Sequence, residues 1–345
     1  MKLINIGIIG CGSISKYRHA PEYAGNTACK IVGYCDEKPE RAQELAEKYG
    51  GVVYKDYSEL ISDKNIDAVS VCTSNYWHAP ITIAALEAGK HVLCEKPMAT
   101  TVEDAEKMVV MAERAGKFLM IGHNQRLADA HVRAKEILKT GELGRVLSFS
   151  TAFGHGGPEV WSADGLSTWF FKKKDAYVGA MGDLGVHKAD LIRWLIDDEI
   201  EEVKAFVGTV DKRNEKGSLI EVDDNAVCIL KSKKGIIGTL TASWTYYGGE
   251  DNSTILHCSN GTMKIYDNPE YPITVTKKSG EKVFYKVGKI QTNESQSKSG
   301  IIDMFINCIL VNKAPEISGE EGLKALKIII ACMESAERGI TVKID

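Results

Sequence analysis

The first 120 residues alternate short apolar runs with polar, helix-prone stretches, and this alternation is the strongest constraint on the fold. Such a pattern predicts a parallel sheet covered by helices on both faces. The apolar runs predict strands at residues 4–9, 30–35, 51–54, 68–72, 91–94 and 118–121. The stretches between them predict helices at residues 39–49, 81–88 and 102–115.

From about residue 145 the sequence becomes rich in β-formers, and residues 239–244 alternate polar and apolar side chains. This period of two is typical of an antiparallel sheet with one open face. We expect helices at 182–196, 300–311 and 320–338, and strands at 146–153, 202–210, 225–231, 235–244, 253–258, 262–266 and 273–277. A chain of 345 residues favours two domains. We place them at 1–125 and 126–345, and the last helices could pack back on the first domain.

Composition excludes several classes of protein. The net charge is only −4 and no long basic block occurs, so neither a nucleic-acid partner nor an anionic membrane is expected. No apolar run is long enough to span a bilayer, and the apolar N-terminus reads as a buried strand rather than an export signal. Nine scattered cysteines without a C-x-x-C pair suit reduced thiols in the cytoplasm and predict no metal site.

A glycine-rich turn follows the first predicted strand. Gly10 and Gly12 would let the backbone turn tightly against a pyrophosphate, with the next helix N-terminus supplying N–H donors. Ser13 and Ile14, inside the turn, are candidate cofactor contacts. Ser15 stands where this fingerprint has a third glycine or alanine, so the turn alone could also be an ordinary glycine-rich loop.

Asp36 ends the second predicted strand and strengthens the dinucleotide interpretation. It follows Gly12 at close to the spacing, roughly 20 residues, at which an acidic side chain accepts hydrogen bonds from the adenosine ribose. A carboxylate there repels a 2′-phosphate, so NAD is favoured over NADP. Lys38 and Arg41 leave NADP open, because either side chain could turn toward a phosphate.

Two groups of residues could carry chemistry. Glu95 and Lys96 follow the predicted strand 91–94, and the carboxyl ends of parallel strands face the ligand crevice. Asp183 and His187 are four residues apart, so they share one helix face. Each group also has a simpler explanation, namely a solvated pair that caps a strand, and a helix-dipole carboxylate beside a half-buried histidine.

Taken together, segments 10–12, 72–78, 88–97, 141–146 and 182–187 resemble the glucose–fructose oxidoreductase, inositol dehydrogenase and MocA (Gfo/Idh/MocA) family. The resemblance covers nearly the whole chain. It implies a Rossmann domain with a doubly wound parallel sheet, followed by an α/β domain with a large, mostly antiparallel open sheet. It also implies assembly into homodimers or homotetramers through that sheet. The departures are Ser15, and Ser74 where the family often has proline.

The resemblance further implies that Lys96, Asp183 and His187 form the catalytic group, and that the Lys96–Pro97 peptide bond is often cis. A histidine with a near-neutral pKa suits general acid/base catalysis. We therefore expect His187 to take the hydroxyl proton, Asp183 to support it, and Lys96 to stabilise developing alkoxide charge. Lys96 is an alternative carrier of that proton.

The remaining site residues are expected around the nicotinamide and the substrate. Cofactor contacts are expected from Arg41, Thr73, Asn75, His78, Glu95 and Lys96, although His78 could instead cap a helix and Glu95 a strand. Arg126 at the domain junction is a candidate substrate contact. His155, Trp161 and Trp169 suit a sugar site, since aromatic faces cover C–H surfaces. Both tryptophans could equally be core or subunit contacts.

These features predict an NAD-dependent oxidoreductase that transfers a hydride between nicotinamide and a secondary hydroxyl or keto group of a sugar, inositol or related polyol. One alternative is an NAD-dependent glycosidase that works by transient oxidation and elimination. Another is a non-catalytic dinucleotide-binding regulator, which the presence of Lys96, Asp183 and His187 argues against. The sequence does not name the substrate, the carbon oxidised or the direction of reaction.

Overall fold

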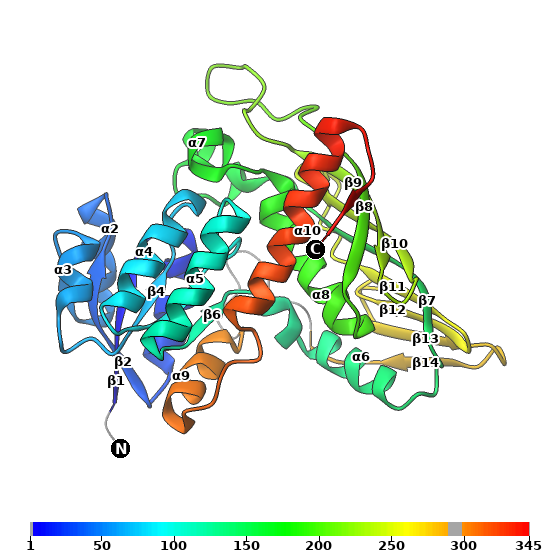
Figure 1. Cartoon of the computed structure of the whole chain (residues 1–345), viewed down its shortest axis with the longest axis horizontal. Helices are drawn as coiled ribbons and strands as arrows, with labels where there is room; N and C mark the ends of the chain where they lie inside the picture. Colours follow the sequence, from blue (N-terminus) through cyan, green and yellow to red (C-terminus); the bar gives the residue numbers. More distant parts are fainter. Residues whose placement is uncertain (1–2, 289–298, 345) are drawn as a thin grey trace.

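The computed structural model describes residues 3–288 and 299–344, which form two sheets with helices between and around them (Figure 1). The first sheet has six parallel strands in the order β3-β2-β1-β4-β5-β6. This is the order of a doubly wound dinucleotide-binding sheet. The strands are β1 (Ile4–Ile9), β2 (Cys29–Cys35), β3 (Val52–Val53), β4 (Ala68–Val71), β5 (His91–Cys94) and β6 (Leu119–Ile121).

Helices join these strands, and local capping sets several of their ends. The Thr101 side chain accepts from the backbone N–H of Asp104 to begin α5, and Gly116 ends it in the left-handed region. The side chain of Asp56 caps α3 in the same way. The helices are α1 (Ala20–Gly25), α2 (Pro39–Tyr49), α3 (Tyr57–Ser62), α4 (Asn75–Glu87) and α5 (Val102–Ala115), and a π-helical turn, Ser15–His19, precedes α1.

The second sheet has nine strands in the order β14-β13-β12-β11-β7-β10-β9-β8-β15. Only β7 and β10 pair in parallel, so the predicted mostly antiparallel sheet is confirmed. Its strands are β7 (Val146–Gly154), β8 (Ile200–Gly208), β9 (Asn225–Ser232), β10 (Ile237–Ser243), β11 (Thr254–Cys258), β12 (Gly261–Ile265), β13 (Ile273–Lys277), β14 (Lys282–Tyr285) and β15 (Val342–Lys343).

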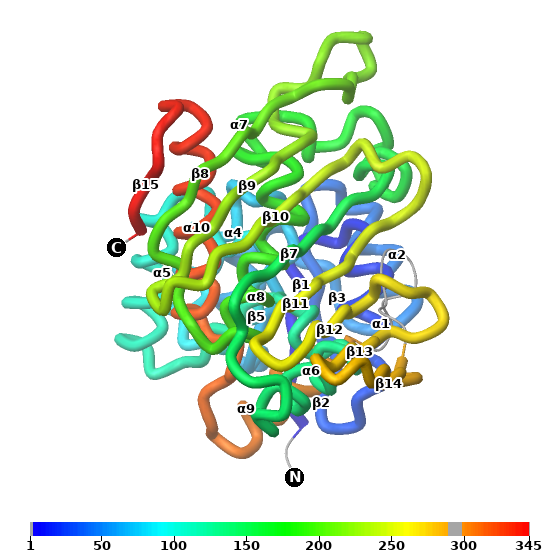
Figure 2. The backbone as a smooth tube through the Cα atoms, turned by 90° about the vertical axis from the view of Figure 1, so that its right-hand side faces the viewer, coloured from blue at the N-terminus to red at the C-terminus, as the bar shows by residue number. Residues whose placement is uncertain are grey.

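The two faces of this sheet differ. Along β9, Ala226, Cys228 and Leu230 point into the core, whereas Val227 and Ile229 on the other face are 53% and 50% exposed. Helices α8 (Val186–Ile196) and α10 (Gly319–Arg338) cover the inner face. Figure 2 shows the outer face, on which no described helix lies. The remaining helices are α6 (Asp129–Lys139), α7 (Lys173–Ala176) and α9 (Ile301–Val311).

The last two helices return to the first sheet (Figure 1). Ile302 and Phe305 of α9 share a buried cluster with Ile6 and Ile8 of β1. Helix α10 packs against α5 and β6 as well as α8 and β8. At the closest approach, a Cβ on Gly322 would lie 2.6 Å from Ile121 Cγ1, so only glycine fits without displacing the neighbouring side chain. Within the described ranges, no helix combines the length and apolar character needed to cross a membrane.

Candidate active site

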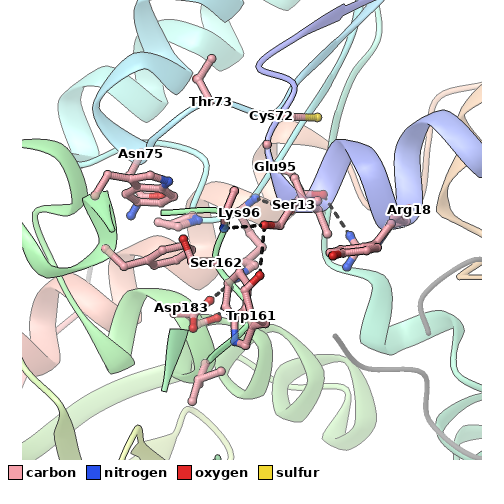
Figure 3. Close-up of a pocket in the computed structure, with 18 of the residues that line it drawn as sticks. Ser13, Arg18, Cys72, Thr73, Asn75, Glu95, Lys96, Trp161, Ser162 and Asp183 are labelled. Atoms are coloured by element: carbon pink, nitrogen blue, oxygen red, sulfur yellow. Dashed lines mark hydrogen bonds and ion pairs between the residues drawn. The ribbon is translucent and has the colours of Figure 1, made fainter. Parts of the chain in front are cut away.

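A cleft opens where the carboxyl ends of β1, β4 and β5 meet α8 and the segment after β7 (Figure 3). This is the edge at which open parallel sheets bind ligands. The cleft is lined from the first sheet by Gly12, Ser13, Ile14, Arg41, Thr73, Asn75, His78, Glu95 and Lys96, and from the later part of the chain by His155, Trp161, Trp169, Asp183 and His187.

The glycine turn at the end of β1 fits a pyrophosphate. Gly10 has φ +89°, and a Cβ there would lie 2.6 Å from the backbone of Cys72, so this position requires glycine. A Cβ on Gly12 would meet no atom within 4 Å, so the turn borders open space. Ser15 is buried and its hydroxyl donates to the Gly10 carbonyl at 2.5 Å, which explains how a serine is accommodated at the third position.

Asp36 lies behind this turn and does not line the cleft directly. Its Oδ2 accepts from the Cys11 N–H at 2.6 Å, and its Oδ1 accepts from the Lys38 N–H at 2.8 Å. The carboxylate thus ties the glycine turn of β1 to the end of β2. A carboxylate fixed beside such a turn fits the ribose of a bound dinucleotide.

Lys96 and Asp183 meet at the base of the cleft. The Lys96 ammonium donates to Asp183 Oδ1 at 2.7 Å and to the Asp183 carbonyl at 3.0 Å (Figure 3). The Lys96–Pro97 peptide bond is cis. Although burial raises the pKa of Asp183, the positive charge of Lys96 outweighs it and holds that pKa below its ordinary value. The pair therefore consists of an ammonium and a carboxylate, with one ammonium hydrogen left for another oxygen.

His187 lies one helical turn beyond Asp183 and is nearly fully buried. Burial, reinforced by the charge of Lys96, holds the pKa of His187 well below 6.5, so the imidazole is neutral at pH 7. Its Nδ1 has no hydrogen-bond partner among the described residues. The rings of Phe153 and His123 contact it at centroid distances of 5.9 Å and 6.2 Å. A neutral, desolvated imidazole at this place can accept a proton from a substrate hydroxyl.

Residues 158–171, which we call the strap, form the outer wall of the cleft. Trp169 stacks on Phe170 with ring centroids 3.8 Å apart, and Trp161 meets Phe170 edge-on at 5.2 Å. Nearby, His155 Nδ1 accepts from the Gly157 N–H at 2.9 Å. Burial lowers the pKa of His155, and a neutral ring that accepts at Nδ1 carries its proton on Nε2. The wall therefore combines aromatic faces with an N–H donor.

Both halves of the chain match models of one protein family. Residues 4–123 match the model described as oxidoreductase family, NAD-binding Rossmann fold, and residues 131–264 match the GFO/IDH/MocA C-terminal domain. Levoglucosan dehydrogenase of Pseudarthrobacter phenanthrenivorans is 30% identical over 294 residues, which are 76% of this chain and 73% of that protein. The chain belongs to the Gfo/Idh/MocA family.

Other members of the Gfo/Idh/MocA family cover the chain more completely. Myo-inositol 2-dehydrogenase of Thermotoga maritima is 28% identical over 343 residues, 99% of each chain. The solved structure of a levoglucosan dehydrogenase in complex with NADH superposes with a TM-score of 0.88 at 27% identity, and the match covers all of both chains. The first sheet of this Gfo/Idh/MocA protein is thus an NAD-binding Rossmann domain, and the chain is a member of an oxidoreductase family.

Three of the residues predicted to contact the cofactor also have partners within the protein. His78 places its ring nitrogens 2.7 Å from the Pro97 carbonyl and 3.1 Å from the Thr73 carbonyl, so it braces the loops that follow β4 and β5. Asn75 donates to the Ala176 carbonyl. Glu95 is paired with Arg18 at 2.9 Å, and burial, which would raise its pKa, is outweighed by that cation so that the pKa is lowered.

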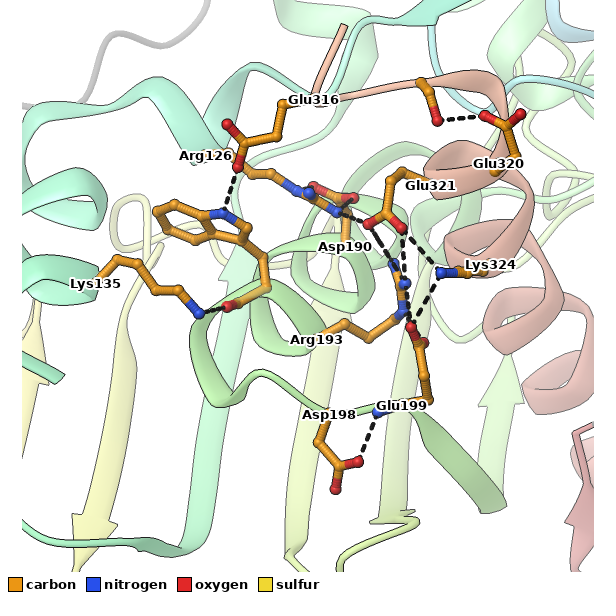
Figure 4. Close-up of polar contacts among 12 residues, drawn as sticks. Arg126, Lys135, Asp190, Arg193, Asp198, Glu199, Glu316, Glu320, Glu321 and Lys324 are labelled. Carbon is orange, nitrogen blue, oxygen red and sulfur yellow. Dashed lines mark hydrogen bonds and ion pairs between the residues drawn. The ribbon is translucent and has the colours of Figure 1, made fainter. Parts of the chain in front are cut away.

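Arg126 does not line the cleft, contrary to the substrate contact proposed from the sequence. Its guanidinium is buried and donates to both carboxylate oxygens of Asp190 at 2.6 and 2.7 Å, and to Glu321 at 2.7 Å (Figure 4). Its neighbours Asn124 and Gln125 line the cleft instead. Because Arg126 lies in the short 3-10 turn Asn124–Leu127, successive side chains face different sides, and this one joins α8 to α10.

Sequence reasoning missed several residues of the site. Tyr17 and Arg18 line the cleft from the turn after β1, and the spacing of a helix entering at Ser15 could have indicated them. Trp244 is fully buried and its Nε1–H donates to Asp183 Oδ2 at 3.0 Å. Asp164, in the strap, reaches Lys38 and Arg41. Nothing in the local sequence around Trp244 or Asp164 indicates these long-range partners.

Proposed function

We propose that this protein is an NAD-dependent oxidoreductase that interconverts a secondary hydroxyl and a keto group on a neutral sugar, inositol or related polyol. The observation that supports this most directly is the meeting of Lys96, Asp183 and neutral His187 at the base of a cleft that also borders the glycine turn. Residues 1–125 serve as the cofactor domain, and residues 126–345 as the substrate and oligomerisation domain.

Gly12, Ser13 and Ile14, which line the cleft, would hold the dinucleotide together with Asp36 beside the turn, and Thr73 and Asn75 would lie near its nicotinamide end. When bound, NAD supplies a hydride acceptor at its nicotinamide ring. The chain supplies the proton chemistry and the positioning. His187 accepts the hydroxyl proton, because its neutral ring is available at pH 7. The remaining Lys96 hydrogen stabilises the negative charge that develops on the same oxygen.

Charge pairing in the cleft favours a neutral substrate. The lining cations are Arg18, Arg41 and Lys96. Each of them is already paired with a carboxylate, respectively Glu95, Asp164 and Asp183. A uronate or a sugar phosphate would have to compete with these carboxylates for the cations, and breaking the buried Arg18–Glu95 pair would cost several kcal/mol. A neutral pyranose or cyclitol needs only stacking surfaces and hydroxyl partners, which Trp161, Trp169 and His155 provide.

The outer face of the large sheet supports assembly of identical subunits. Phe206 is 78% exposed and lies opposite Val227 in the β8–β9 register, beside Ile229. Contiguous exposed apolar side chains on a sheet face are typical of a subunit interface, so we infer a homodimer or homotetramer formed through this face. We also infer a cytoplasmic location, since all nine cysteines are buried as free thiols.

A substrate screen tests the proposed function. The purified protein is mixed with NAD or NADP and a panel of neutral cyclitols, pyranoses, aminosugars, sugar acids and sugar nucleotides, while nicotinamide absorbance is followed. We expect net NADH formation with a neutral cyclitol or pyranose. Product formed without net NADH would indicate the elimination chemistry of a glycosidase instead. With the substrate found, near-normal turnover in both H187A and K96M would contradict the assigned roles.

A further inference from the structure

The strap contacts the cofactor end of the cleft as well as the substrate end. The Ser13 hydroxyl, in the glycine turn, donates to the Trp161 carbonyl at 3.2 Å and accepts from the Ala163 N–H at 3.1 Å (Figure 3). The two groups are 148 and 150 residues from Ser13 in the chain. Residues of the strap, which belongs to the second proposed domain, therefore contact the loop that would border the pyrophosphate of a bound dinucleotide.

The next residue of the strap, Asp164, extends this contact to the ribose end. Its Oδ1 lies 2.6 Å from Lys38 Nζ and 2.7 Å from Arg41 Nη2. Partial burial raises the pKa of Asp164, but the two hydrogen-bonded cations outweigh it and lower that pKa below its ordinary value. Asp164 is therefore a carboxylate that pairs with both cations of this corner and offsets one of their two positive charges.

Lys38 and Arg41 are the residues that leave NADP open as a cofactor. Lys38 is held beside Asp36, because its N–H donates to Asp36 Oδ1 at 2.8 Å, and the Arg41 N–H in turn donates to the Lys38 carbonyl at 2.9 Å. Two cations next to Asp36, the carboxylate expected beside the ribose, would attract a 2′-phosphate. Asp164 pairs with both Lys38 and Arg41, so the 2′-phosphate of NADP would have to compete with its carboxylate for these cations.

We propose that Asp164 is a cofactor-specificity residue, supplied by the strap, which favours the free 2′-hydroxyl of NAD by occupying the two cations that would otherwise bind the 2′-phosphate of NADP. The inference rests on the proposed dinucleotide function. It assigns discrimination between NAD and NADP to two carboxylates, one from each of the two proposed domains. Asp36 would be the carboxylate beside the ribose, and Asp164 offsets part of the positive charge that would compensate for the repulsion between Asp36 and a 2′-phosphate.

Calorimetric titration of nucleotide fragments tests this without any turnover. ADP-ribose and 2′-phospho-ADP-ribose are titrated into the wild type and into D164N, D164E and E215Q. Glu215 contacts the strap at the exposed Ser167, so E215Q removes one negative charge without touching Lys38 or Arg41. Because D164N removes two partly exposed ion pairs and frees both cations, it should improve the relative affinity for the 2′-phosphorylated ligand by about tenfold.

We expect D164N to raise the ratio of the affinity for 2′-phospho-ADP-ribose to the affinity for ADP-ribose, while its ADP-ribose affinity stays within about twofold of wild type. D164E and E215Q should keep the wild-type ratio. The gain in D164N should shrink as salt is raised, since exposed charges are screened. An unchanged ratio in D164N, or an equal loss of both affinities, would overturn the inference while leaving the dinucleotide site intact. Failure of the wild type to bind either ligand would instead overturn the proposed cofactor site, and the inference with it.

Discussion

The indole Nε1–H of Trp244 donates to Asp183 Oδ2 at 3.0 Å, while Asp183 Oδ1 accepts from Lys96. Both oxygens of this buried carboxylate are therefore held in place by the protein itself. Trp244 directly follows β10, and its side chain is completely buried beside Phe170 and Phe171. Trp244, at the end of a strand of the open sheet, thus sets the orientation of Asp183, which lies in the helical turn that directly precedes α8.

Replacing Trp244 with phenylalanine removes this donor and keeps most of the aromatic volume. An unpaired buried carboxylate oxygen costs about 1–3 kcal/mol, so we expect kcat to fall about tenfold or more as Asp183 and Lys96 lose their fixed orientation. NADH affinity, measured by fluorescence titration, should stay within about twofold of wild type, because the Trp244 side chain contacts Asp183, Phe170 and Phe171 rather than the glycine turn. Parallel losses of kcat and NADH affinity would contradict a positioning role.

The pH dependence of oxidation should report the lowered pKa of His187. A base must be deprotonated to act, and burial moves the His187 pKa well below 6.5. We therefore expect kcat/KM for alcohol oxidation to stay level as pH falls through 6.5 and to decline only at lower pH. H187A should lower kcat by about 10²–10⁴-fold, whereas the exposed control H257A should not. An inflection in kcat/KM above pH 6.5 that disappears in H187A would contradict the assignment.

Arg126 should matter for stability rather than for substrate binding. R126M leaves Asp190 buried without its cation, and breaking a buried pair in this way costs about 3–5 kcal/mol. Chemical denaturation should show this loss in the free energy of unfolding. The matched control is R133M, whose guanidinium pairs with Glu136 at the exposed surface of α6. A stable R126M with a raised KM for substrate would restore the substrate role that we have rejected.

The outer face of the sheet should control the oligomeric state. Phe206 is 78% exposed in a single chain, and a carboxylate in its place would be costly at an apolar interface. We expect F206D to shift the mass measured by light scattering toward the monomer, while V110D, at an exposed position of α5, leaves it unchanged. A wild-type mass for F206D, or a monomeric wild type, would contradict assembly through this face.

Much of the fold could be predicted because local patterns determine it. The predicted bounds of β1, β5, α2, α5 and β13 coincide with the structure. Helix α4 begins at Asn75 rather than at the predicted residue 81. In sequence Pro80 looks like a helix boundary, but the structure contains it inside the helix. The helix expected at 182–196 begins as a π-helical turn, Met181–Gly185, whose extra residue no period of 3.6 reveals. Helix α6 was not predicted.

The site residues also divide into those that the sequence could indicate and those that only the fold brings together. Lys96 and Asp183 are 87 residues apart, and their proximity followed from the family resemblance rather than from spacing. The contacts of Asp164 and Trp244 depend on which distant segments the fold brings together, and no short motif encodes them. Arg126 was misread because position at a domain junction does not determine side-chain direction. Long-range ion pairs of this kind become visible only in three dimensions.

The return of α9 to the first sheet affects how the protein can be made. Ile6 and Ile8 lie near the start of the chain, but the Ile302 and Phe305 side chains that cover them are synthesised about 300 residues later. During translation the apolar side chains of β1 therefore stay uncovered by α9 until that helix has emerged from the ribosome. Chaperone dependence should therefore be greatest for nascent chains stalled just before residue 300, and an isolated N-terminal fragment should aggregate.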